Sequence, residues 1–214
     1  QRRVPVSLDA PVFTLTHAMG FKGVLGGEYN FNRTEASIWK RFWLPASWGK
    51  IDCSVKAGAE WNTVPFPLLI LPEANLSYIT QRETFCLINN MEFLNDRFAS
   101  MSISYDMNGK LFNRIPLLKN LKWREMFRVR ALWGTLTDKN NPFKSSNPDL
   151  FRFPTRDGKF TSFVMDPKVP YVEASVGIYN IFKLLHVEYV HRFTYRDNPG
   201  INKNGIRFMV LMVF

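Results

Sequence analysis

The chain has 214 residues, of which 46% are hydrophobic and 15% aromatic, so it can bury a large apolar area and is not a disordered chain. Its net charge of +10 suits a nucleic-acid partner, but most basic residues alternate singly with apolar ones, which argues against nucleic acid. The only cysteines, Cys53 and Cys86, form no CxxC metal motif and no disulfide framework, and we expect both to be free thiols.

Apolar and polar residues alternate along most of the chain, and this period of two indicates strands with one apolar and one polar face. The pattern predicts strands near residues 12–22, 29–44, 50–62, 83–94, 97–112, 121–137, 170–181, 185–196 and 205–214. No stretch of about 18 apolar residues predicts a membrane-spanning helix. Several of these strands exceed the usual length of about 5–6 residues, as expected for a tilted wall across a bilayer.

The connections between these strands differ in length. Residues 180–184 form a tight turn, whereas 138–169 and 197–204 are rich in turn-forming polar residues. Short turns at one end and long polar loops at the other are typical of outer-membrane barrels. We therefore expect 138–169 and 197–204 outside the cell and 180–184 in the periplasm.

The last predicted strand ends on an aromatic residue. Phe208, Val210, Met212 and Phe214 fall on one face together with Ile206, while Arg207 falls on the other. This strand resembles the assembly signal that the outer-membrane insertion machinery reads. An edge strand of a soluble protein is the alternative, but such an apolar edge would template aggregation.

Several stretches carry a family resemblance: 26–30, 64–69, 112–117, 176–182 and 196–201, with the Phe-terminated strand. They resemble the C-terminal barrel part of an uncharacterised family of Bacteroidota outer-membrane proteins. Members carry a carboxypeptidase-regulatory-like β-sandwich ahead of the barrel. The resemblance implies a location and a fold, but no activity and no functional residues.

The polar faces are rich in charge. Alternation places a set of arginines on the same side as two glutamates: Arg124, Arg128, Arg130, Arg192 and Arg207, with Glu173 and Glu188. They form either a ladder of ion pairs that fills a closed lumen or a pore lining that selects anions. In both cases we expect Glu173 and Glu188 to pair with arginines of neighbouring strands, because an unpaired buried carboxylate is costly.

Motifs for chemistry are missing. His186 and His191 point to opposite faces of one strand and His17 is distant, so no metal site is expected. The sequence has no GxSxG, no HExxH and no Gly-rich phosphate loop. We expect no catalytic residue and no cofactor. The six tryptophans suit aromatic girdles at the membrane interfaces, with carbohydrate stacking as the alternative.

Together these patterns predict an all-β, transmembrane, antiparallel up-and-down β-barrel of about eight or nine strands, integral to the bacterial outer membrane. The expected function is a non-enzymatic subunit or scaffold of an outer-membrane assembly, with a channel whose lumen is lined by arginine as the alternative. Expected partners are outer-membrane lipid and lipopolysaccharide, the insertion machinery and other outer-membrane proteins.

The number of strands bears on whether the barrel is whole. Counting back from Phe214 through nine strands makes residues 12–22 run from the outside of the cell to the periplasm. Either an odd number of strands is missing upstream, or residues 12–22 are not a strand and an eight-stranded barrel remains. We expect the first, so that residues 1–214 are one barrel segment that lacks upstream strands and a periplasmic sandwich domain.

Overall fold

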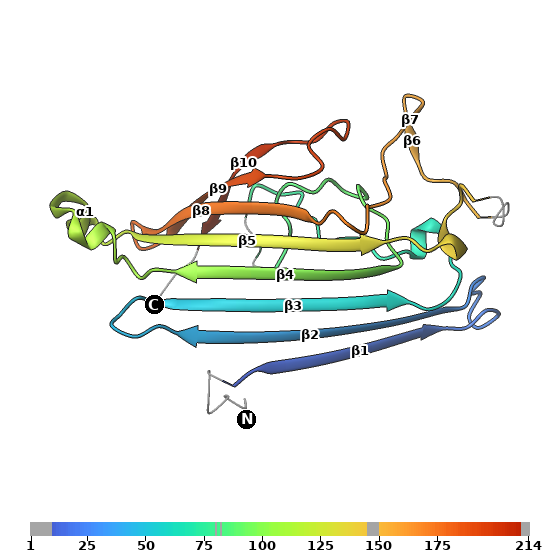
Figure 1. Ribbon diagram of the computed structural model, residues 1–214, viewed down its shortest axis with the longest axis horizontal. Coiled ribbons are helices and arrows are strands. Elements are labelled where there is room, and N and C mark those ends of the chain that lie inside the picture. The colour runs from blue at the N-terminus through green and yellow to red at the C-terminus, as the bar shows by residue number, and fades with distance from the viewer. Residues whose placement is uncertain (1–9, 80, 82, 145–149, 211–214) are drawn as a thin grey trace.

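One antiparallel sheet dominates the computed structural model, which describes residues 10–79, 81, 83–144 and 150–210. Its eight strands lie side by side in chain order, each hydrogen-bonded to the next (Figure 1). They are β1 (Val12–Gly20), β2 (Phe31–Trp43), β3 (Lys50–Glu60), β4 (Arg97–Asp106), β5 (Arg124–Thr135), β8 (Tyr171–Ile181), β9 (Leu185–Arg192) and β10 (Asn204–Val210). The predicted all-β, up-and-down arrangement is confirmed.

Small elements lie in the connections. A separate hairpin pairs β6 (Thr155–Arg156) with β7 (Lys159–Phe160). The helices are short: α1 (Pro116–Leu121), η1 (Phe66–Leu68), η2 (Phe112–Arg114) and η3 (Asp138–Asn140). Over the described ranges, no helix is both long and apolar enough to cross a membrane.

The predicted strand over residues 83–94 is wrong. These residues belong to the connection 61–96 between β3 and β4, which packs against one face of the sheet. Phe85, Cys86, Leu87 and Ile88 are buried consecutively, because this segment is enclosed on all sides and is not a two-faced strand. The sheet therefore has eight strands, and β1 runs in the direction opposite to β10. The inference that an odd number of strands is missing rested on nine strands and no longer follows.

Within the described ranges the sheet does not close into a ring, and β1 and β10 are its edges. The free edge of β10 does not pair with β2. One residue of β10, Phe208, instead donates its backbone N–H to the carbonyl of Tyr78 at 2.8 Å and forms an isolated bridge with Ile79. Segment 61–96 thus reaches from β3 across the sheet to its opposite edge.

The two ends of the sheet carry different connections. Residues 44–49, 107–123 and 182–184 lie at one end, which we call the short-turn end (Figure 1). The described residues of 21–30, 136–170 and 193–203 lie at the other, the long-loop end, where segment 61–96 also leaves β3 and returns to β4. The predicted placement of 138–169 and 197–204 opposite to 180–184 is confirmed, while the side of the membrane stays a prediction.

The faces of the sheet differ in polarity. On β5, Phe127, Val129 and Trp133 are 39–42% exposed, whereas Arg128 and Arg130 on the alternate positions are at most 6% exposed. The polar face is the covered one, because segment 61–96 packs on it, and the apolar face has no cover among the described residues. We call these the inner and the outer face.

Candidate functional site

The inner face of β5, β8 and β9 carries the charged residues that alternation predicted. Arg128, Arg130, Glu173, Glu188 and Arg192 are each at most 6% exposed. Burial of so many charges is tolerated only where each has partners of opposite charge or polar groups. Here the partners come from other strands of the sheet and from segment 61–96.

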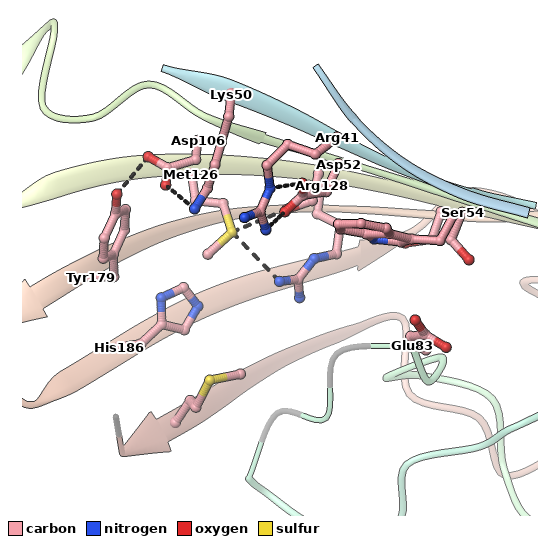
Figure 2. A pocket seen from close by; sticks show the side chains of 14 residues that line it. Arg41, Lys50, Asp52, Ser54, Glu83, Asp106, Met126, Arg128, Tyr179 and His186 are labelled. Carbon is pink, nitrogen blue, oxygen red and sulfur yellow. Dashed lines mark hydrogen bonds and ion pairs between the residues drawn. The ribbon is translucent and has the colours of Figure 1, made fainter. Parts of the chain in front are cut away.

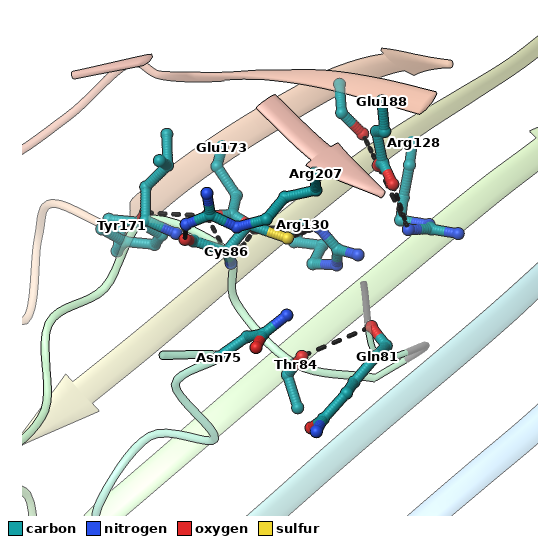
Figure 3. Close-up of polar contacts among 12 residues, drawn as sticks. Asn75, Gln81, Thr84, Cys86, Arg128, Arg130, Tyr171, Glu173, Glu188 and Arg207 are labelled. Carbon is teal, nitrogen blue, oxygen red and sulfur yellow. Dashed lines mark hydrogen bonds and ion pairs between the residues drawn. The ribbon is translucent and has the colours of Figure 1, made fainter. Parts of the chain in front are cut away.

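The first cluster is centred on Glu173 of β8 (Figure 3). Arg130 Nη1 of β5 lies 2.9 Å from its carboxylate, and the hydroxyl of Tyr171 donates to it at 2.9 Å. The carboxylate also accepts the backbone N–H groups of Cys86 at 2.9 Å and Leu87 at 3.1 Å. Glu173 therefore ties segment 61–96 to the strands, with four donors on one carboxylate.

Arg192 of β9 makes the second link to the segment. Its guanidinium lies 2.6 Å from Glu92, and it also donates to the carbonyl of Leu87 at 3.2 Å and to that of Tyr195 at 2.7 Å. Arg207 of β10 donates to the carbonyl of Cys86. The sequence placed these arginines on the polar face but missed Glu92, because nothing in the local pattern shows which connection covers that face.

Arg128 and Glu188 form the third cluster, 3.0 Å apart. Glu188 lies on β9 and Arg128 on β5, so the pair reaches past the intervening β8, where Ser175 and Gly177 leave room. Ser175 donates to Glu188, and a Cβ on Gly177 would lie 2.9 Å from the ring of His186. Both glutamates are thus paired with arginines as expected, but Glu188 pairs one strand further away than predicted.

Two arginines of the predicted ladder differ from the rest. Arg124, at the beginning of β5, is exposed and packs over the ring of Tyr179 at 5.9 Å. Arg207 packs over the ring of Tyr78, also at 5.9 Å. The ladder therefore has three buried ion pairs flanked by two arginines held through aromatic and backbone contacts.

A cavity of about 400 Å³ lies on the inner face toward the short-turn end (Figure 2). Paired charges line it: Arg41 donates to Asp52 at 2.6 Å, and Lys50 lies 3.7 Å from Asp106. Tyr179 donates to Asp106 at 2.5 Å. Segment 61–96 fills the inner face beside β5, β8 and β9, and the cavity is the hollow that it leaves.

The apolar residues of the last strand lie on the outer face. Phe208 and Val210 are 42% and 60% exposed, opposite in side to Arg207. Met212 and Phe214, the rest of the predicted assembly signal, lie outside the described residues.

No cluster of metal-ligating side chains is formed by the residues that the structure describes. They contain no group of three or more His, Cys, Asp or Glu that suits a metal ion. His186 is buried on the inner face and His191 lies on the outer face, as expected. Burial raises the pKa of the Cys86 thiol, which favours a structural and unreactive thiol.

The structure thus defines an open, eight-stranded antiparallel sheet with a charged, covered inner face and an apolar outer face. Residues 1–143 match the C-terminal domain of a family of unknown function, DUF5686, so the chain belongs to this family. The match covers β1 to β5 with segment 61–96. A comparison with curated proteins finds no match.

Proposed function

We propose that this chain forms wall strands of a β-barrel in the bacterial outer membrane and acts as a non-enzymatic subunit or scaffold of an outer-membrane assembly. The observation that carries the proposal is the polarity of the sheet. A soluble sheet buries its apolar face, whereas here the apolar face is exposed and the charged face is covered. A barrel in lipid requires this arrangement.

The outer face supports a lipid environment over its full width. Apolar residues of this face are exposed on seven of the eight strands, for example Phe13, Val55, Val129, Val176 and Phe208, and on β4 they are partly exposed. Soluble monomers rarely expose a continuous apolar surface of this size. The charged residues that alternation places on this face, Lys40, Arg97 and Glu125, lie in the outer thirds of their strands, where charge costs least in a bilayer.

The open edges of the sheet support a larger ring. No described strand pairs with the free edge of β1, and unpaired N–H and C=O groups are not tolerated in lipid, so a membrane-embedded sheet must close. We infer that strands outside residues 12–210 complete the barrel. The sandwich domain implied by the family resemblance belongs to the same proposal.

The covered inner face favours a scaffold over an open pore. Segment 61–96 is attached to the wall through Glu173, Arg192 and Arg207, and so occupies the lumen. The cavity of about 400 Å³ favours the second candidate function, a channel with a lumen lined in part by arginine. Conductance in planar bilayers separates the two: the scaffold predicts no ion current from the intact protein, and the channel predicts discrete openings.

Lysine substitution tests the membrane proposal directly. Val176, in the middle of β8, is 45% exposed on the outer face, so Val176→Lys in a soluble protein would be nearly neutral. At the centre of a bilayer it costs about 2–4 kcal/mol. Ser54→Lys, on the inner face beside the cavity, is the matched control. We expect only Val176→Lys to reduce the heat-modifiable, urea-resistant protein in outer-membrane fractions, and equal recovery of both variants would contradict the proposal.

A further inference from the structure

The connection between β4 and β5, residues 107–123, stands apart from the rest of the molecule. It holds η2 and α1 at the short-turn end, and neither helix contains a buried residue. Figure 1 shows α1 beyond the ends of the strands. A helix of six residues is marginal without packing, so this segment needs a surface to cover it.

Apolar side chains gather on this segment and on the neighbouring turn. Asn180 donates to the carbonyl of Lys122 at 2.7 Å and joins the two connections. Phe182 in the turn is 87% exposed, and Leu117 in α1 is 81% exposed. We call the exposed set the short-turn patch: Leu111, Ile115, Leu117, Leu121, Phe182 and Leu184.

The charge of this end has one sign. Its connections, 44–49, 107–123 and 182–184, contain five basic residues and no acidic one: Lys110, Arg114, Lys119, Lys122 and Lys183. The connections of the long-loop end contain ten basic and ten acidic residues. The excess positive charge in the connections is therefore confined to the end that carries the patch.

We propose that the short-turn patch inserts into the interface of the bilayer leaflet at this end, and that its basic residues bind the phosphates of anionic phospholipid. The inference rests on the proposed membrane location. Exposed leucine and aromatic side chains beside lysine are the composition of segments that lie in the membrane interface. Anionic lipid attracts such basic clusters, and the long lysine stems reach headgroups while their carbons stay in the apolar layer.

A lipid surface fits this composition better than a protein partner does. Lysine is depleted in protein–protein interfaces, and four of the five basic residues are lysines. The patch also lies next to the apolar outer face, because the backbone N–H groups of Leu111 and Phe112 donate to Glu125, whose side chain is on the outer face of β5. The occupant is therefore the lipid that already surrounds the strands.

Bromolipid quenching of a site-specific fluorophore tests this inference in the full chain reconstituted into vesicles. In a Cys53→Ala background, the fluorophore is placed at Leu117→Cys, at Val176→Cys on the outer face, or at Asp157→Cys in the exposed β6–β7 hairpin. Cys86 is 1% exposed and stays unlabelled. We expect strong quenching at 176, clear quenching at 117 and none at 157.

The binding of anionic headgroups by the basic residues is tested by comparing vesicles with and without phosphatidylglycerol. We expect quenching at 117 to increase with this lipid, and the gain to fall by about half or more in Arg114→Gln/Lys119→Gln/Lys122→Gln. Arg152→Gln/Arg156→Gln/Lys168→Gln, at the long-loop end, is the matched control and leaves the gain unchanged.

Each other outcome is decisive. Quenching at 176 without quenching at 117 overturns the inference and leaves the proposed function intact, whereas no quenching at 176 overturns the proposed function itself. Equal quenching at 117 with and without phosphatidylglycerol overturns the recognition of anionic headgroups. A probe at 117 that is shielded from an aqueous quencher in native membranes but not in vesicles identifies a protein occupant and also overturns the inference.

Discussion

Glu173→Gln should release the segment 61–96 from the wall. The substitution keeps the shape of the side chain but removes the charge that faces Arg130. The amide group of the new glutamine is itself a donor, and it would replace one of the two carboxylate oxygens that accept from the four donors around Glu173. Breaking a buried ion pair by removing one partner costs about 3–5 kcal/mol. Because two of the lost acceptor contacts hold Cys86 and Leu87, we expect the loss to appear first in this segment.

Hydrogen exchange of the amides of Cys86 and Leu87 measures that release. In Glu173→Gln we expect their exchange to increase by at least 100-fold, which corresponds to about 2.7 kcal/mol or more at 25 °C. Glu73→Gln is the matched control, because Glu73 pairs with Lys56 at a half-exposed site where ion pairs contribute about 0–1 kcal/mol. Unchanged protection at residues 86 and 87 in a folded Glu173→Gln protein would refute the assignment of Glu173 as the anchor.

Three further predictions concern the anchor, the assembly signal and the topology. Arg192→Lys should lower the free energy of unfolding by about 2 kcal/mol, because one ammonium cannot replace the guanidinium contacts to Glu92, Leu87 and Tyr195; a change below about 0.5 kcal/mol in denaturant titrations would contradict this. Deleting Phe214 should reduce membrane insertion more than synthesis, as measured by pulse labelling and fractionation, and normal insertion would count against the assembly signal. Protease added to whole cells should cut within 138–169, whereas cleavage only after rupture of the outer membrane would invert the topology.

The strands were predictable because their environment is two-sided. Each of these strands carries polar side chains on its inner face and apolar side chains on its outer face, and a period of two in the sequence records this directly. For the same reason the positions of Arg128, Arg130 and Glu173 on one face followed from the sequence. The apolar run Phe85–Ile88 was wrongly predicted as a strand, because a strand that is buried on both faces also shows a short apolar run. In the structure these four residues belong to a connection that is enclosed on all sides.

The partners across the inner face were not predictable from local pattern. Glu92 lies one hundred residues from Arg192, and nothing in the sequence around either residue shows that the β3–β4 connection folds over β9. Helix α1 has no counterpart among the elements predicted from the sequence, and Pro116 stands in its first turn, where proline is tolerated. Arg124 follows the alternation of the ladder but is the first residue of β5, where it is exposed and packs over the ring of Tyr179.

A label scan along β5 tests the central claim most directly. With one spin label at a time at residues 126–134 of the membrane-reconstituted protein, we expect oxygen accessibility to peak at 127, 129, 131 and 133. Accessibility to a water-soluble nickel complex should be low at those positions, because they face lipid. A period of two in which these positions are instead the most accessible to the nickel complex would contradict a membrane wall, and would identify the apolar face as one that water or a soluble partner covers.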